Sequence, residues 1–296
     1  MTATTTPREA PPTLPGPEPE AATAGGRRVW WIYALLVLGL LAFIGPFLWM
    51  LLGSLKTRGE LLQLPPTWLP ADPTLGNYSR LFGRLDFPRY FANSAVVAGA
   101  VTVANLVFCS MLGYALAKLR FAGRDKLFLL VMATLMVPGS ITLVPLFVLM
   151  SNLGLVNTHA GLILPFAAGP FGVFLMRQFM AGIPEELLEA GRVDGASEFY
   201  LFWRIAMPLA TPALATLGIL TFLGSWNSLL WPLVNSTSER MYTLPVALAI
   251  FTRGEHSADY GLLMAGAVVI VVPVLVVFLA LQRYFTQGIA TTGLKG

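Results

Sequence analysis

The chain has 296 residues, of which 56% are hydrophobic and only 11% are charged. A typical soluble domain carries about 25% charged and about 45–50% apolar residues, so this composition excludes most water-soluble proteins. The net charge is only +4 and no long basic run is present, so we expect no nucleic-acid partner. The single cysteine, Cys109, excludes a disulfide framework and a cysteine-based metal cluster. The composition therefore predicts an integral membrane protein.

Six apolar stretches meet the length of about 20 residues that a membrane helix needs. Of all Asp, Glu, Lys, Arg and His residues, only His159 and Arg177 lie within them, near the two ends of the fourth stretch. Ionisable groups inside a bilayer usually line a proton or ion path, so their near absence argues against a proton-coupled transporter. The predicted fold class is an all-α integral membrane protein with six transmembrane helices, at approximately 29–53, 92–117, 127–150, 159–180, 209–235 and 261–282.

The distribution of Lys and Arg predicts the orientation. With the N-terminus inside the cell, 12 of the 19 Lys and Arg residues fall on the inner side and seven on the outer side. The short second loop, with four of these cations around Asp125, carries much of this asymmetry. Both termini are therefore expected to be cytoplasmic.

Three segments outside the spans have distinct compositions. The first 26 residues contain six prolines and few large apolar residues, which predicts a disordered cytoplasmic tail over 1–28 before a transmembrane domain over 29–296. In the long outer loop, about 54–91, Trp68 and Tyr78 suit the lipid headgroup level. The apolar segment 242–251 is too short to span a membrane and predicts an interfacial or re-entrant piece.

The fourth loop, about 181–208, predicts two short helices set at an angle. Pro184 followed by two glutamates is a good helix start, and Gly195 can end that helix. Ser197 can cap a second helix that ends before Pro208. The residues around the predicted turn are small, so another surface can approach the backbone closely, and two acids there can accept hydrogen bonds. Packing of this loop on its own membrane domain is the simpler alternative.

This loop resembles the coupling loop, or EAA motif, of ABC-importer permeases. That pattern reads E-A-A-x-x-D-G-A and continues into a hydrophobic stretch that ends I-x-x-P. The positions in register are Glu189, Ala190, Gly191, Asp194, Gly195, Ala196, Phe202, Ile205 and Pro208. Gly191 replaces the third alanine of the motif and keeps the position small.

Other stretches are similar to the carbohydrate-uptake branch of these permeases, such as the inner-membrane permease of the maltose system. They are Leu64-Pro-Pro-Thr-Trp-Leu-Pro70, Thr74-Leu-Gly-Asn-Tyr78, Leu143-Val-Pro-Leu-Phe147, Ser225-Trp-Asn227 and Gln282-Arg-Tyr-Phe-Thr-Gln-Gly288. The segment Ala290-Thr-Thr-Gly293 departs from the usual Thr-Ala-Gly order of that branch. The resemblance covers roughly residues 30–296.

The resemblance implies a multi-pass permease subunit in the cytoplasmic membrane of a prokaryote, which forms half of a sugar pathway. Its implied partners are a second permease subunit of unlike sequence, two cytoplasmic ATPase subunits at the coupling loops, and an external solute-binding protein. No G-x-x-x-x-G-K-[ST] phosphate loop is present in the sequence. We therefore expect no enzyme activity and no cofactor in this chain, and ATP and Mg²⁺ are expected in the partner ATPases.

Five residues are candidates for sugar contact, because aromatic rings stack on sugars and amides bond their hydroxyl groups: Asn93, Tyr114, Trp226, Asn227 and Trp231. Packing and interface anchoring are the alternatives for each of them. Three other functions stay open. A permease for another polar solute, such as a polyol or glycerol phosphate, is the nearest one, and a stand-alone channel or scaffold is more distant. A membrane-embedded enzyme is disfavoured, because the sequence has no G-x-S-x-G, H-E-x-x-H or intramembrane Asp pair.

Overall fold

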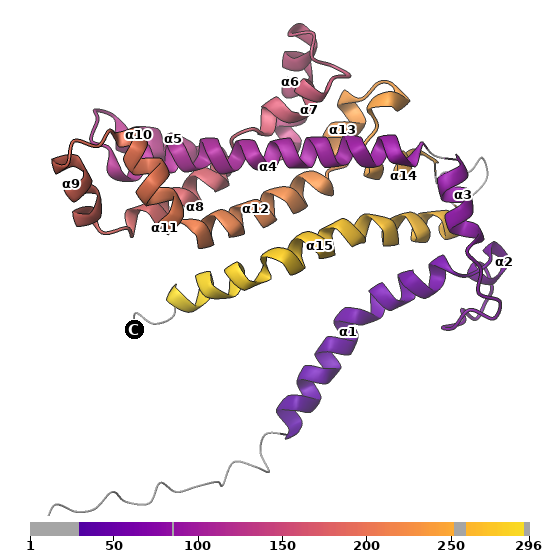
Figure 1. Cartoon of the computed structure of the whole chain (residues 1–296). Helices are drawn as coiled ribbons and strands as arrows, with labels where there is room; N and C mark the ends of the chain where they lie inside the picture. The colour runs from indigo at the N-terminus through magenta and orange to yellow at the C-terminus, as the bar shows by residue number, and fades with distance from the viewer. Residues whose placement is uncertain (1–29, 85, 252–258, 293–296) are drawn as a thin grey trace, which may run out of the picture. The chain divides into compact units, whose positions relative to one another are not determined.

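The structure, a computed structural model, describes residues 30–84, 86–251 and 259–292, and every regular element in these ranges is a helix (Figure 1). Three helices are individually long and apolar enough to cross a membrane: α1 (Trp30–Ser54), α4 (Phe87–Lys118) and α15 (Tyr260–Thr292). Three pairs of bent helices each pass the same test together, which gives up to six spans. The all-α membrane fold is confirmed. The predicted tail over 1–28 lies outside the described residues.

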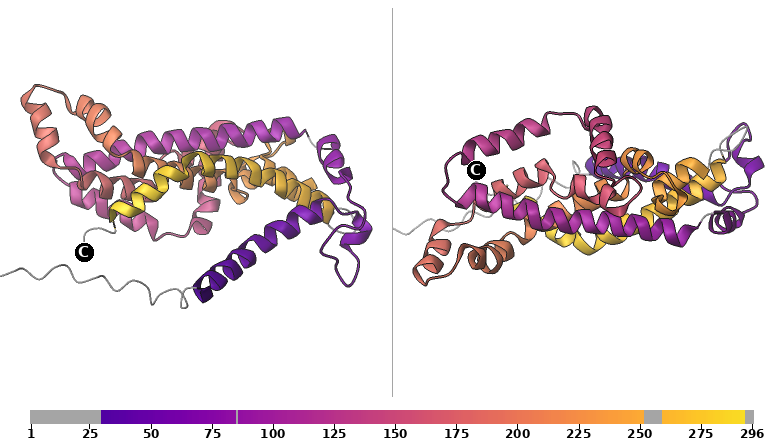
Figure 2. Two further views of the ribbon diagram at one scale, coloured as in Figure 1. Left: turned by 60° about the horizontal axis from the view of Figure 1, so that its bottom comes forward. Right: turned by 90° about the horizontal axis from the view of Figure 1, so that it is seen from above.

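The third predicted span is not one continuous helix. It consists of α5 (Arg124–Leu135) and α6 (Gly139–Asn152), whose axes differ by 103° (Figure 2). The span predicted over 127–150 is therefore a bent pair of helices, which meets the length and hydropathy of a membrane span only as a pair. Pro138 explains the break, because proline lacks an N–H group and disfavours helical backbone at the preceding Val137.

The fourth and fifth predicted spans are also interrupted. The fourth comprises α7 (His159–Ile163), the 3-10 turn η1 (Leu164–Phe166) and α8 (Pro170–Ala181), with a bend of 42°. The fifth span, predicted over approximately 209–235, contains helix α12 (Thr211–Trp226) and a separate short helix, α13 (Leu230–Asn235). Asn227 follows α12 and its side chain donates to the Leu223 carbonyl at 3.0 Å, a local bond that competes with helix continuation.

Short helices occupy the loops at the end of α4 predicted to face outside. They are α2 (Arg58–Leu61), α3 (Gly76–Arg84), η3 (Glu239–Met241) and α14 (Leu244–Phe251). The last corresponds to the short apolar segment predicted over 242–251, and four of its residues are buried. The Tyr78 hydroxyl lies 2.8 Å from the Ser54 hydroxyl, and the Trp68 ring packs edge-on against Trp49 at 5.1 Å.

The described residues between Trp49 and Thr292 form one compact unit around α4, which packs most extensively against α8 and α12. Glycine permits this close packing, as small residues commonly do between membrane helices. A Cβ atom at Gly113 would lie 2.7 Å from Met176 Cβ and 2.8 Å from the Arg177 nitrogen, and a Cβ at Gly172 would lie 2.8 Å from Cys109 Sγ. The backbones of α4 and α8 can therefore approach only because these positions lack side chains.

Candidate functional site

The predicted coupling loop folds into its first helix as the sequence indicates. Helix α9 (Glu185–Val193) begins after Pro184 and carries two glutamates in its first turn. Gly195 adopts a φ of +80°, and its N–H donates to the Arg192 carbonyl at 3.0 Å, while the Ala196 N–H donates to the Gly191 carbonyl at 2.9 Å. These two bonds form a Schellman motif, which favours glycine at the left-handed position. The turn therefore depends on Gly195.

The second part of the loop is longer than predicted. Helix α10 (Glu198–Leu201) starts at Ser197, whose hydroxyl accepts from the Tyr200 N–H at 3.3 Å. It continues through a π-helical turn, η2 (Phe202–Ala206), into α11 (Met207–Leu209). The prediction that this helix ends before Pro208 is wrong, because the wider π turn precedes the proline and accommodates a residue without an N–H group. We call Glu185–Leu209 the loop hairpin.

The loop hairpin stands on an apolar base. Leu188, Leu201 and Phe202 are buried and belong to the same core cluster as residues of α4 and α8. The Phe202 ring lies 5.4 Å from the Tyr114 ring of α4. Figure 1 shows the hairpin at one end of α4, with α13 and α14 towards its opposite end. We call these the coupling end and the far end of α4.

The small residues of the motif divide into two groups. Gly191 is half-buried, and a Cβ atom there would lie 2.5 Å from Leu201 Cδ2; Ala196 also packs against the apolar base. Ala190 and Gly195 are exposed, and a Cβ at Gly195 would meet nothing within 4 Å. Gly191 and Ala196 therefore allow the two helices of the hairpin to pack closely against each other. Ala190 and Gly195 leave its outer surface without large side chains, so a partner can approach the backbone.

The outer surface of the loop hairpin combines acids with exposed apolar groups. Glu189 and Asp194 are exposed. Val193 is 87% exposed and Phe199 is 64% exposed, so both add apolar area to this surface. Of the remaining motif residues, Ile205 is half-buried and Pro208 is exposed.

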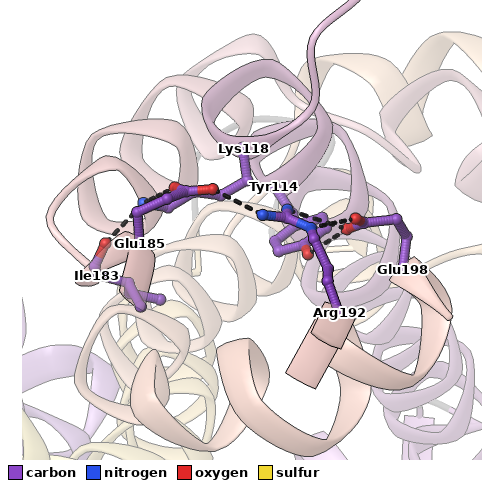
Figure 3. Close-up of polar contacts among 6 residues, drawn as sticks. All are labelled: Tyr114, Lys118, Ile183, Glu185, Arg192 and Glu198. Atoms are coloured by element: carbon purple, nitrogen blue, oxygen red, sulfur yellow. Dashed lines mark hydrogen bonds and ion pairs between the residues drawn. The ribbon is translucent and has the colours of Figure 1, made fainter. Parts of the chain in front are cut away.

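Arg192 connects the two helices of the hairpin (Figure 3). Its Nε donates to Glu198 Oε1 at 2.7 Å, and its Nη1 donates to Glu185 Oε1 at 2.9 Å. Glu185 begins α9 and Glu198 begins α10. One guanidinium therefore spans the start of both helices, a geometry that suits the planar fork of arginine.

Two residues of α4 complete this network. The Tyr114 hydroxyl donates to Glu198 Oε2 at 2.7 Å. Lys118, one helical turn further, donates to the Ile183 carbonyl at 2.6 Å and to Glu185 Oε2 at 3.2 Å. The two cations and two carboxylates balance, and we call these five side chains the α4 clasp: Tyr114, Lys118, Glu185, Arg192 and Glu198.

The clasp shifts the acidity of its carboxyl groups. Hydrogen bonds from Arg192 lower the pKa of both Glu185 and Glu198, and partial burial opposes this effect in each case. Lys118 further lowers the pKa of Glu185, and the Tyr114 hydroxyl further lowers that of Glu198. Both glutamates in turn raise the pKa of Arg192. Both carboxyl groups are therefore ionised at neutral pH.

The five residues predicted for sugar contact are not gathered at one site. Tyr114 belongs to the clasp. Trp226 is buried and donates to the Ile270 carbonyl at 3.1 Å, and buried Trp231 donates to the Gly161 carbonyl at 3.1 Å. Asn93 donates to the carbonyls of two residues near the far end. Asn227 alone among the five is exposed.

Sequence reasoning did not single out four members of the clasp as site residues. The sequence marks Glu185 only as a helix start and Lys118 only as a cation that indicates orientation. A usable signal was present, because Glu185 and Arg192 are seven residues apart and so share one face of a helix. Contact with α4, across 84 residues for Tyr114 and Glu198, leaves no local signal in the sequence.

Comparison with known proteins places this architecture in a defined class. The family of binding-protein-dependent transport system inner membrane components matches residues 87–291. The chain belongs to this family: it is a multi-pass permease component of an ABC transporter in the cytoplasmic membrane, distinct from the ATPase. The prediction of a transport subunit is thereby confirmed.

Individual relatives cover almost the whole chain. An arabinooligosaccharide transport permease, AraQ of Halalkalibacterium halodurans, is 41% identical over 88% of this chain and 96% of its own. The diacetylchitobiose uptake permease NgcG of Streptomyces coelicolor is 35% identical over 91% and 90%. Among solved structures, a bacterial ABC transporter involved in alginate import is similar, with a TM-score of 0.78, 26% identity, and coverage of 89% of this chain and 99% of that chain.

Proposed function

We propose that this chain forms half of the membrane pathway of an ATP-driven importer for oligosaccharides, and that the loop hairpin docks on a cytoplasmic ATPase subunit. The observation that carries the proposal is the hairpin itself. It places Glu189, Ala190, Asp194 and Gly195 of the motif on an exposed surface at one end of the membrane helices. The low profile at Ala190 and Gly195 lets a partner approach, and exposed Val193 and Phe199 provide apolar area.

The oligosaccharide class is supported by the relatives. Two similar permeases are named for arabinooligosaccharides and diacetylchitobiose, and a third, from Rhizobium radiobacter, is named for lactose and is 34% identical over 86% of this chain and 93% of its own. The scarcity of ionisable groups inside the spans is consistent with a neutral solute. The finer assembly that we propose has a second, unlike permease, two ATPase subunits that use ATP and Mg²⁺, and a solute-binding protein.

A phosphorylated solute is the second candidate. A permease of Brucella abortus named for sn-glycerol-3-phosphate is 30% identical over 88% of this chain and 95% of its own. Phosphate recognition needs cations, preferably arginine, in the pathway. Arg177, at the cytoplasmic end of α8 with its guanidinium 3.8 Å from the Phe128 ring centre, is poorly placed for this task. The oligosaccharide is therefore favoured.

For the sugar pathway we propose contact by Asn227 among the five predicted residues. The polar groups of Asn93, Tyr114, Trp226 and Trp231 are engaged in internal hydrogen bonds, so a sugar would have to displace them. Asn227 is exposed, and its carbonyl oxygen is the acceptor that a sugar hydroxyl needs.

The test of docking uses Gly195→Trp, with Gly195→Ala as the matched control. Both variants place a side chain at a φ of +80° and share its strain, but only tryptophan adds bulk to the outer surface. The transporter is purified in detergent through a tag on this chain, and the proteins that co-purify are identified. We expect the ATPase subunit to accompany the wild type and the alanine variant and to be lost from the tryptophan variant.

Two outcomes would contradict the proposal. Absence of an ATPase subunit from the wild-type preparation would remove the importer assignment. Retention of the ATPase and of full transport by Gly195→Trp would show that the docking surface lies elsewhere. The substrate class is tested in proteoliposomes with the cognate binding protein, where uptake of a labelled phosphorylated solute in place of neutral oligosaccharides would favour the second candidate.

A further inference from the structure

Besides its apolar base, the loop hairpin has two kinds of connection to the membrane helices, and they differ in stiffness. Its covalent connections run to α8 and α12, and both are interrupted. Gly182 and Pro184 separate α8 from α9, and the helical segments Glu198–Leu209 and Thr211–Trp226 meet at an angle of 80°. Such breaks absorb changes in backbone angle, as hinges do. The chain itself therefore transmits the hairpin's movement poorly to α8 and α12.

The connection to α4 is different, because it joins residues far apart in the chain through specific polar contacts. Tyr114 and Lys118 lie one turn apart on the same face of α4 and bond to Glu198 and Glu185, which begin α10 and α9. Lys118 also bonds to the Ile183 carbonyl, just ahead of the hairpin. Two points of attachment, one for each helix of the hairpin, fix its orientation as well as its position on α4.

Helix α4 is also the element best suited to carry a displacement through the membrane. It runs without a break over the 32 residues Phe87–Lys118, with its only proline in the first turn. By contrast, the segments α5 and α6, α7 to α8, and α10 to α12 are bent by 103°, 42° and 80°. Near its far end, Asn93 of α4 bonds to the carbonyls of Arg240 and Tyr242. Rigid secondary elements are among the structures that carry coupling between distant sites.

From these observations we propose that the α4 clasp makes the loop hairpin and α4 move as one body, with Arg192 as its positioning residue. Movement of the hairpin by the ATPase then reaches the pathway through α4. This inference rests on the proposed function and adds the route of coupling to it. Arg192 acts by holding Glu185 and Glu198 where Lys118 and Tyr114 meet them, and it does not itself contact the solute.

The test uses the complete transporter in proteoliposomes with its binding protein, and compares Arg192→Gln, Arg192→Lys and Tyr114→Phe. Two control variants make the same kind of change away from the clasp. Arg124→Gln removes a cytoplasmic arginine that pairs with its own neighbour Asp125 at 3.3 Å, and Tyr90→Phe removes a hydroxyl from a buried residue at the far end of α4. The readouts are ATPase co-purification, ATP hydrolysis, and solute transported per ATP.

We expect both Arg192 variants to retain the ATPase subunit and to transport about tenfold less solute per ATP, a size typical of coupling between sites. Lysine keeps the charge but cannot fork to two carboxylates, so it should resemble glutamine. Tyr114→Phe should lose less transport per ATP than the Arg192 variants, because it removes one hydrogen bond of the clasp and leaves both bonds of Arg192 in place. Both controls should match the wild type.

A distance measurement tests the route directly. Spin labels at Leu187→Cys on the hairpin and Leu112→Cys on α4 occupy exposed positions, and a second pair joins Leu187→Cys to Leu220→Cys on α12. Between the ATP-free and ATP-bound transporter, the hairpin–α4 distance should stay constant while the hairpin–α12 distance changes. In Arg192→Gln the hairpin–α4 distance should also vary.

Several results would overturn the inference while leaving the proposed function intact. Wild-type transport per ATP in Arg192→Gln would do so, as would full activity of Arg192→Lys or an unchanged hairpin–α12 distance. Loss of the ATPase subunit from Arg192→Gln would assign the residue to docking instead. Failure of the wild type to bind an ATPase would instead remove the proposed function itself.

Discussion

The two ends of α4 are held by different chemistry. At the coupling end, the α4 clasp joins side chains to side chains through four charges, and its ion-paired groups outside α4 are 31–42% exposed. Near the far end, Asn93 is buried and its amide donates to the Arg240 and Tyr242 carbonyls at 2.8 and 3.0 Å. Asn157 holds the next loop there, where its Oδ1 accepts from the N–H groups of Thr237 and Ser238 at 3.1 Å.

The difference suggests different mechanical roles. A buried neutral amide bonded to backbone carbonyls has no alternative partner, so its loss leaves unpaired groups at a cost of about 1–3 kcal/mol. Exposed ion pairs exchange with water and typically contribute about 0–1 kcal/mol. The contacts at the far end therefore stabilise one arrangement of the fold. The clasp at the coupling end orients the hairpin but contributes little to the free energy of unfolding.

The largest expected effect is at Asn157. This residue adopts a φ of +61° and its side chain accepts from three donors, the third being the Ser238 hydroxyl. Asn157→Ala loses these bonds and strains the backbone, so we expect destabilisation by about 3 kcal/mol. The measurement is the unfolding midpoint of the purified transporter in detergent. Asn157→Gly relieves the strain and should recover about 1 kcal/mol; equal midpoints for the two variants would contradict this account.

Asn93→Ala should have the next largest effect. It leaves two backbone carbonyls without their donor and removes the acceptor that lies 3.1 Å from His159 Nε2. We expect a loss of about 2 kcal/mol. Asn227→Ala is the matched control, because Asn227 is exposed and bonds only within its own helix, so its midpoint should move by no more than about 0.5 kcal/mol. Similar shifts for both variants would remove the contrast between buried and exposed amides.

Among Asn157, Asn93 and Arg192, substitution of the arginine by glutamine should change the free energy of unfolding least. The same substitution should change coupling most. The apolar base of Leu188, Leu201 and Phe202 holds the hairpin in the absence of the clasp, so we expect a loss of no more than about 1 kcal/mol. The same unfolding measurement applies. A loss comparable with that of Asn157→Ala would show that the clasp is a structural element of the fold rather than a device for orientation.

The contrast also explains what could be predicted from the sequence. Pro184, Gly195 and Ser197 act on their immediate neighbours, so the two helices of the coupling loop were predictable from local rules. The membrane helices were predictable for the same reason, because the length and hydropathy of an apolar stretch are local properties of the sequence. The 103° bend between α5 and α6 was indicated in the sequence by Pro138. The continuous hydropathy of residues 127–150 predicts a span and does not show where it bends.

What local rules could not supply is contact across the chain. Tyr114 meets Glu198 and Lys118 meets Glu185 only because α4 packs beside α8, a consequence of Gly113 and Gly172. The sequence therefore predicts Tyr114 for the sugar pathway, and it predicts a helix end before Pro208 where the structure has a π turn. The motif identified the surface of the hairpin, and tertiary packing decided which of its residues face inward.

Acid should loosen the coupling end selectively, and this is the smallest effect that we predict. Because the pKa of Glu185 and Glu198 is lowered in the folded chain, their contribution to stability is complete above the ordinary carboxyl pKa of 4.5 and is lost as the pH falls through the lowered values. A fluorophore at Val193→Cys should therefore gain mobility below about pH 4.5, measured as falling anisotropy. A fluorophore at Thr237→Cys, beside the uncharged Asn157 contacts, should not gain mobility.

Raising the salt concentration to about 0.5 M should reproduce part of the acid effect, because these charges are partly exposed. Equal responses at both positions, or none at Val193, would show that charge does not distinguish the two ends of α4.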